Sequence, residues 1–376
     1  MLRSLFLVAL LAASAFAQDL PHGKIIDDVK CKADVTQSYA LYVPSNYSAD
    51  RKWSVILAFD PRGRGRTPVE RFEAAAEKFG YIVAGSNNSR NGPAQVSLTA
   101  SKAMLEDLRA RFSIDDKRLY AAGQSGGARF AMDLALSTKQ FAGVIASSAG
   151  FAHPRGGEVA LDFSVFGTAG TDDFNYQEMR RFDRQLSSPH RVQIFAGAHT
   201  WLPSSLAVEA LEWMEIQAMK SGARAKDDAL IDHSFNSRKA QLAAMRDTGE
   251  IWRANKSLAA DFEGLRDVKD FADAAAALES SKDVRDARTK SATEEMHESQ
   301  YYAEISNFAD QLGNPLQKED SLAALKSRLG TLADQAKAPA DSPDRQLARR
   351  VIGAITADYA GRTEPEFRKM LEDARP

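Results

Sequence analysis

A serine flanked by glycines is the residue in this chain best placed to do chemistry. Ser125 lies in the stretch 123–127, Gly-Gln-Ser-Gly-Gly, a G-x-S-x-G pattern that is typical of a sharp turn between a strand and a helix. A serine hydroxyl becomes an effective nucleophile only when it is exposed beside a base, and such a turn exposes it. We therefore predict Ser125 as a nucleophile, with the backbone N–H of Gly126 as one donor to an oxyanion.

His199 is the base that we predict for this serine. It follows the apolar, strand-like run 192–195, and reactive residues of an open parallel sheet gather at the carboxyl ends of its strands. The same rule disfavours His190, which precedes that run. His153 follows another strand-like run and is a candidate for the lining of the pocket.

Two adjacent aspartates supply the carboxylate that a serine–histidine pair needs. Asp172 and Asp173 lie in the turn after the apolar run 163–166. One of them is expected to accept a hydrogen bond from the histidine and to fix its tautomer, while the other caps the helix that starts near Asn175. We predict Asp173 as the acid and keep Asp172 as the alternative. A purely structural role for both aspartates, as caps or solvated side chains, is the competing interpretation.

The second oxyanion donor is expected in the loop that follows the apolar run 53–59. Pro61 has no N–H to donate, so Arg62 is the first candidate and Gly63 the next. A hole built from the N–H groups of Gly126 and Arg62 would stabilise a tetrahedral intermediate.

Strand-like and helical segments alternate through the first part of the chain. Short apolar runs separated by helical patterns predict a doubly wound, mostly parallel α/β sheet. We expect strands at about 38–43, 53–59, 81–84, 118–122, 143–146, 163–166 and 192–195, with helices at about 68–79, 95–112, 128–137, 176–186 and 205–220.

The composition changes near Gly222. From there to the end, strand-like runs disappear and Ala, Leu, Glu, Lys and Arg recur at helical spacing. We therefore predict a catalytic domain over 18–221 and an all-α domain over 222–376. Paired helices of the tetratricopeptide kind are one hypothesis for the second domain, and an irregular helical appendage is the other.

The N-terminal segment has the pattern of a cleavable signal peptide. A short basic start is followed by an apolar stretch and by Ala15-Phe16-Ala17, a small-residue cleavage motif. We predict that residues 1–17 are removed and that the protein is secreted or periplasmic. A buried helix or an uncleaved anchor is the alternative.

Charge and cysteine content exclude other classes of protein. The 376 residues carry a formal net charge of −2, which offers no basic surface for nucleic acid. Cys31 is the single cysteine, so no intrachain disulfide can form. No His/Cys cluster has the spacing of zinc ligands either.

Taken together, these motifs resemble the α/β-hydrolases. The order serine, aspartate, histidine and the histidine loop 197–203, Gly-Ala-His-Thr-Trp-Leu-Pro, are similar to those of secreted esterases of the polyhydroxybutyrate-depolymerase and feruloyl-esterase kind. The resemblance covers about 35–220 and implies carboxylic-ester hydrolysis through an acyl-enzyme, without a metal or an organic cofactor. One departure is Asp60-Pro61, where such esterases carry His-Gly.

The function that we expect from these residues is that of a serine hydrolase acting on a small-molecule or polymeric ester. The alternatives are a serine peptidase and a non-catalytic binding or scaffold protein that uses the helical region to hold a protein partner. The set Ser125, Asp173 and His199 favours the enzyme, because a protein without activity has no need of all three.

Overall fold

The computed structural model describes residues 20–153, 155–361 and 364–375. The predicted signal peptide, 1–17, lies outside the described residues. Within them, no helix has the length and apolar character needed to cross a membrane.

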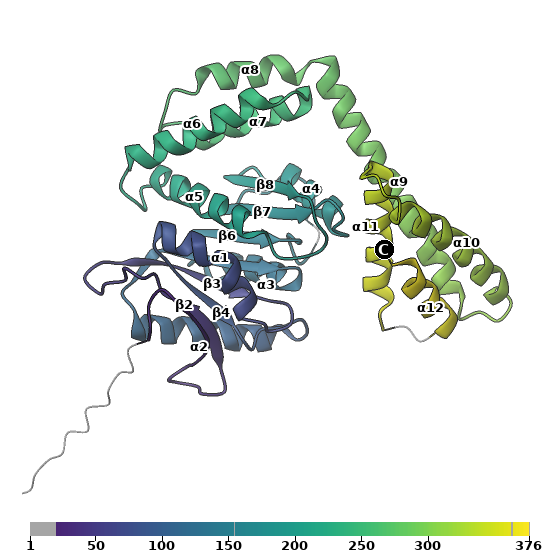
Figure 1. The fold of residues 1–376 in the computed structure, drawn as a ribbon, viewed down its shortest axis with the longest axis horizontal. Helices are drawn as coiled ribbons and strands as arrows, with labels where there is room; N and C mark the ends of the chain where they lie inside the picture. The colour runs from purple at the N-terminus through teal and green to yellow at the C-terminus, as the bar shows by residue number, and fades with distance from the viewer. Residues whose placement is uncertain (1–19, 154, 362–363, 376) are drawn as a thin grey trace, which may run out of the picture.

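The first half of the chain forms an eight-stranded sheet in the order β1-β2-β4-β3-β5-β6-β7-β8 (Figure 1). Strand β2 runs antiparallel to both of its neighbours, and the remaining pairs from β4 to β8 are parallel. The predicted mostly parallel α/β sheet is thus confirmed. The strands are β1 Ile25–Lys30, β2 Ser38–Tyr42, β3 Trp53–Phe59, β4 Tyr81–Ser86, β5 Ile114–Gln124, β6 Gly143–Ser147, β7 Ser164–Gly170 and β8 His190–Phe195.

Helices cover both faces of this sheet. Side chains of α2, α3 and α4 pack on one face in a core that includes Met104, Met132 and Phe182. Side chains of α1 and α5 pack on the other face, where Phe72 and Trp213 are buried. The five helices are α1 Arg66–Phe79, α2 Ala94–Arg111, α3 Gly126–Thr138, α4 Tyr176–Gln185 and α5 Ser204–Lys220. Because apolar side chains are buried on both faces, the central strands read as continuous apolar runs.

The described chain after α5 is helical, as predicted. It forms α6 Asp228–Ala244, α7 Thr248–Phe262, α8 Lys269–Glu279, α9 Lys282–Gln311, α10 Lys318–Ala336, α11 Pro343–Tyr359 and α12 Pro365–Ala374. These helices vary from 10 to 30 residues in length. A repeat of the tetratricopeptide kind stays a prediction.

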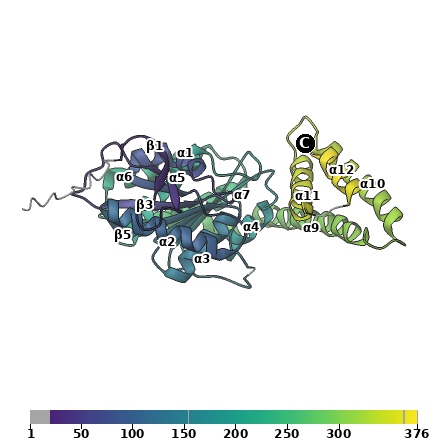
Figure 2. The same cartoon turned by 90° about the horizontal axis from the view of Figure 1, so that it is seen from below.

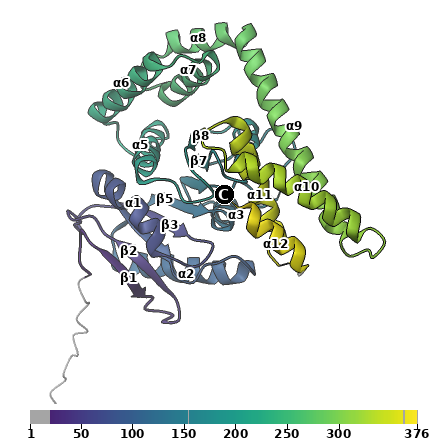
Figure 3. The ribbon, with the colours of Figure 1, turned by 45° about the vertical axis from the view of Figure 1, so that its right-hand side comes forward.

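The helices of this half pack around two separate hydrophobic cores. Residues of α6 and α7, including Ile231 and Phe262, share a core with Ile216 and Met219 of α5. Helices α9 to α12 instead surround their own core, centred on residues such as Ile305, Leu329 and Ile355. The long helix α9 leads from the first group to the second, so that α10–α12 lie to one side of the sheet (Figures 2 and 3). The boundary predicted at 222 falls in the turn before α6, and its use as a domain boundary stays a prediction.

The topology brings the carboxyl ends of β3, β5, β7 and β8 to one edge of the sheet. Asp60, Ser125, Asp173 and His199 follow these four strands within a few residues. Residues far apart in the sequence are therefore collected at one place, as expected for an open α/β sheet.

Candidate active site

Ser125 lies at a strained turn between β5 and α3. Its backbone has φ 55° and ψ −124°, and a non-glycine residue in such a region costs on the order of 1–3 kcal/mol. The flanking glycines are needed because the backbone is crowded here. A Cβ on Gly123 would lie 2.1 Å from the carbonyl oxygen of Gly127, and one on Gly127 would lie 1.9 Å from that of Phe59. This geometry is that of a nucleophile elbow.

Gly126 begins helix α3 immediately after the serine. The first N–H groups of a helix have no partner within the helix, and the positive end of the helix dipole lies there. Both properties suit the Gly126 N–H to an oxyanion beside Ser125, as the sequence predicts. The side chain of Asn91 lies over this residue, since a Cβ on Gly126 would come within 1.9 Å of Asn91 Oδ1.

His199 and Asp173 form a direct hydrogen bond. The distance between His199 Nδ1 and Asp173 Oδ1 is 2.7 Å, and the aspartate is fully buried. The same Oδ1 accepts the backbone N–H of Asn175 at 2.8 Å. The ring of Phe174 stacks on the imidazole with 3.9 Å between the ring centroids. These contacts orient the histidine and place a negative charge where an imidazolium would need it.

One carboxylate oxygen of Asp173 accepts no hydrogen bond from the described residues. Oδ2 is buried, and no described protein atom donates to it. Buried polar atoms of this kind are rare in folded proteins and often occur at functional sites. Asp173 therefore has all its described hydrogen bonds on the oxygen that faces His199.

Asp172, the alternative acid, lies elsewhere. Its Oδ2 forms an ion pair of 2.9 Å with Nη1 of Arg349 in helix α11, and no contact with His199 is present among the described residues. The expectation that the second aspartate caps helix α4 is wrong. The N-cap of α4 is Asn175, which makes no side-chain capping bond, and Asp172 is drawn instead toward the arginine of a distant helix.

The two N–H groups predicted as the second oxyanion donor already have acceptors in the structure. The Arg62 N–H donates to Asp60 Oδ1 at 2.9 Å, and the Gly63 N–H donates to the carbonyl oxygen of Asp60 at 3.1 Å. Both donors are therefore occupied by Asp60. The Arg62 prediction considered only the order of N–H groups along the loop, whereas the buried carboxylate beside it decides where they point.

Asp60 connects this loop to the histidine loop. Its carboxylate accepts a hydrogen bond from the Trp201 indole N–H at 2.9 Å and a bidentate pair of hydrogen bonds from the Arg64 guanidinium, each at 3.1 Å. Burial by itself would raise the pKa of Asp60, but the hydrogen bonds from Arg64, Trp201 and the Arg62 N–H outweigh it, and the pKa lies below its usual value. The aspartate thus stays charged. Its pairing with Trp201 joins two features of the sequence, the Asp60-Pro61 departure and the tryptophan of the histidine loop.

A cleft of about 230 Å³ opens beside the elbow. Phe59 and Phe130 supply apolar walls, and Asn91, Arg129 and Asp133 supply polar ones. Burial raises the pKa of Asp133, so this acid is held closer to its neutral form than an exposed one. A mixed cleft of this kind can hold a small organic group beside Gly126 and Gly127, the residues that follow Ser125.

Comparison with known proteins gives structural matches. No family model matches the chain, and no curated protein matches by sequence. Among solved structures, it is similar to the esterase LipW from Mycobacterium marinum, with a TM-score of 0.42 and 16% identity over 52% of this chain and 82% of that one. It is also similar to Est1E with bound ferulic acid from Butyrivibrio proteoclasticus, with a TM-score of 0.39 and 14% identity over 51% of this chain and 99% of that one. It is similar as well to the fluorophosphonate-binding serine hydrolase FphF from Staphylococcus aureus, with a TM-score of 0.37 and 14% identity over 47% of this chain and 92% of that one.

The chain's own topology defines the class of fold. The strand order, the serine elbow after β5, the aspartate after β7 and the histidine after β8 are the arrangement of an α/β-hydrolase fold. The helices α6 to α12 follow this fold as an addition.

Proposed function

We propose that the protein is a serine hydrolase that cleaves carboxylic esters. The observation that carries this proposal is the 2.7 Å hydrogen bond between His199 and buried Asp173. It lies at the sheet edge where Ser125 occupies a strained elbow. Ser125 is half-buried at this edge, and a buried acid bound to a histidine at the same edge is what activation of its hydroxyl for acyl transfer needs.

In the acylation step, Ser125 Oγ attacks the ester carbonyl carbon while Nε2 of His199 takes the hydroxyl proton. Asp173 holds Nδ1 and stabilises the imidazolium that forms. The N–H of Gly126 stabilises the oxyanion of the tetrahedral intermediate. The imidazolium then protonates the alkoxide, the alcohol leaves and the acyl group remains on Ser125.

In the deacylation step, water takes the place of the alcohol. His199 removes a proton from the water as it attacks the acyl carbon, and returns the proton to Ser125 as the ester bond breaks. The products are the free acid and the original serine. No redox change occurs, and this chemistry needs no cofactor.

The substrate class is a small-molecule or polymeric ester. Its support is the cleft beside the elbow, where aromatic and polar side chains meet. We also infer, from the signal-like residues 1–17 alone, that the protein acts outside the cytoplasm.

A fluorophosphonate probe tests the proposal, because it reacts with an activated serine whatever the natural substrate is. The wild-type protein is expected to label and to hydrolyse p-nitrophenyl esters. Ser125→Ala and His199→Ala are each expected to lose turnover by roughly 10⁴-fold or more. Folding of each variant is checked by circular dichroism.

Other results separate the alternatives. A wild-type protein that neither labels nor turns over any ester in a panel of acyl chains would support the scaffold hypothesis. Faster cleavage of p-nitroanilide peptides than of esters would support a peptidase. Labelling that persists in Ser125→Ala would show that another residue is the nucleophile.

A further inference from the structure

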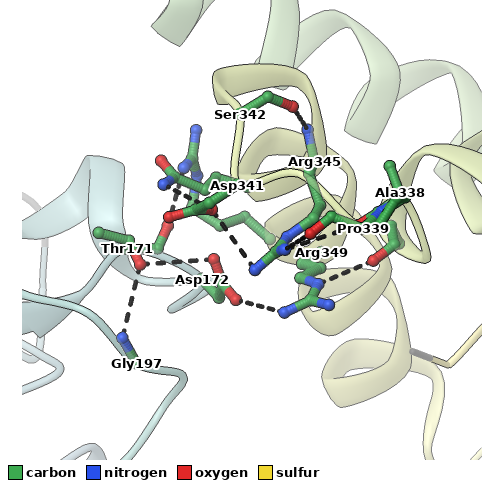
Figure 4. Close-up of polar contacts among 12 residues, drawn as sticks. Thr171, Asp172, Gly197, Ala338, Pro339, Asp341, Ser342, Arg345 and Arg349 are labelled. Atoms are coloured by element: carbon green, nitrogen blue, oxygen red, sulfur yellow. Dashed lines mark hydrogen bonds and ion pairs between the residues drawn. The ribbon is translucent and has the colours of Figure 1, made fainter.

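One helix of the C-terminal half, α11, contacts the loop that carries Asp173. We call residues 171–175 the acid loop. On its N-terminal side, Arg349 of α11 pairs with Asp172 at 2.9 Å (Figure 4). The neighbouring Arg350 donates from Nη1 to the carbonyl oxygen of Thr171 at 2.9 Å. Two successive arginines of one helix thus hold the two residues before Asp173.

The same helix contacts the C-terminal side of the loop and the start of α4. Gly353 of α11 lies against Phe174, since a Cβ on this glycine would be 3.4 Å from Cβ and Cδ1 of the phenylalanine. The guanidinium of Arg350 lies 4.6 Å from the ring centroid of Tyr176. Asp173 is therefore held between two contacts made by one helix.

The arginines are themselves fixed within the helical half. Arg350 is 4% exposed and binds Glu298 of α9 at 2.8 Å. Glu298 also accepts the side-chain N–H of Gln177 at 3.0 Å. Arg349 donates from Nε to the carbonyl oxygen of Ala336, at the end of α10, at 2.9 Å. Side chains tied at several points transmit the position of their helix instead of adapting to the loop.

The acid loop in turn positions the histidine. Phe174 stacks on His199, and the Asp172 N–H donates to the carbonyl oxygen of Gly197, in the histidine loop, at 2.8 Å. A shift of the acid loop would therefore move both the hydrogen-bond partner and the stacking partner of the imidazole. Misplacement of a catalytic group by about 1 Å can cost on the order of 100-fold in rate.

From these contacts we propose that helix α11, held by α9, is a brace for the catalytic acid and base. Arg349 and Arg350 are positioning residues that act through the acid loop on Asp173 and His199. This proposal rests on the proposed function, because it concerns the geometry of the same serine–histidine–aspartate set. It gives the helical half a role in catalysis without any contact with substrate.

The test uses the full-length chain and Arg349→Ala, which removes one link and leaves buried Arg350 in place. We expect kcat for a p-nitrophenyl ester to fall about tenfold with KM changed by less than about twofold, because substrate contacts are untouched while the base is misplaced. Fluorophosphonate labelling of Ser125 is expected to slow by a similar factor. Arg349→Lys keeps the charge for Asp172 and is expected to recover most of kcat.

Arg345→Ala is the matched control. Arg345 lies one turn earlier on α11 and pairs with Asp341 at 3.4 Å, within the helical half (Figure 4). It is expected to leave kcat at the wild-type value. Equal losses in Arg345→Ala and Arg349→Ala would show a general effect on folding and would overturn the brace.

Gly353→Leu tests the brace by crowding rather than by deletion. Leucine favours the helix over glycine, so the thermal midpoint is expected to hold, while the new side chain pushes Phe174 against His199 and lowers kcat. If the wild-type protein is active and both Gly353→Leu and Arg349→Ala keep the wild-type kcat, the brace is disproved while the proposed function stands. If the wild-type protein neither labels nor turns over an ester, the proposed function is contradicted instead.

Discussion

Two buried aspartates flank the histidine loop, and they are bonded in opposite ways. Asp173 binds His199, and Asp60 binds Trp201, two residues further along the same loop. Both oxygens of Asp60 are occupied, by a backbone N–H, an arginine and the indole. Asp173 leaves Oδ2 without a described partner. Asp60, with partners on both oxygens, is suited to fixing the position of the loop. Asp173, with its described hydrogen bonds on one oxygen, is suited to stabilising a positive charge on the imidazole.

The largest effect is expected from Asp173→Asn. An asparagine keeps the size of the side chain but lacks the charge that stabilises an imidazolium, and it favours the wrong histidine tautomer. We expect kcat for a p-nitrophenyl ester to fall roughly 10⁴-fold, with little change in the thermal midpoint. Turnover by steady-state kinetics and unfolding by circular dichroism measure the two quantities. A fall of less than tenfold would remove Asp173 from the catalytic set.

Asp60→Ala is expected to act mainly on stability. The substitution leaves the buried indole N–H of Trp201 and the Arg62 N–H without their acceptor, which costs on the order of 2 kcal/mol in the free energy of unfolding. Urea unfolding measures this loss, and kcat is expected to fall by roughly tenfold or less because the loop still reaches the site. If kcat falls as far as in Asp173→Asn while stability holds, Asp60 takes part in the chemistry and the contrast between the two aspartates fails.

The smallest effect is expected in how the free energy of unfolding changes as the pH is lowered. The pKa of Asp60 is lower in the folded protein than its ordinary value, so the charged form stabilises the fold. This contribution is complete above the ordinary pKa of about 3.9 and is lost as pH falls through the lower folded value. Urea unfolding at pH 6 and near pH 3 is expected to show the wild-type advantage over Asp60→Asn shrinking on acidification. A constant difference would contradict the assignment.

The sequence predicts the placement of the candidate residues where the signal is local, and the structure joins Asp173 to His199, while their catalytic roles stay predictions. Ser125 follows from a five-residue pattern, and His199 and Asp173 follow from the rule that reactive residues lie at strand ends. The apolar runs predict the other strands of the sheet. They do not predict strand β1, because two aspartates interrupt its short pattern, Ile-Ile-Asp-Asp-Val-Lys.

The parts that could not be predicted depend on distant partners. Asp172 meets Arg349, which lies 177 positions along the chain, and arginines on helices look alike in sequence whether they face water or a partner. Arg62 carries the first N–H after Pro61, but this N–H donates to the buried carboxylate of Asp60, which also binds Trp201, 141 positions along the chain. Neither pairing leaves a spacing pattern in the sequence.

The contacts of α11 also set an order of events during synthesis. The elbow, the acid loop and the histidine loop all precede residue 204, where α5 begins, whereas α11 begins at residue 343. A nascent chain therefore completes its reactive residues well before the helix that steadies them, and N-terminal parts of a chain fold first. Full activity would then appear only after α11 has been synthesised, and a chain that stops before α11 would lack the contacts of Arg349 and Arg350 with the acid loop.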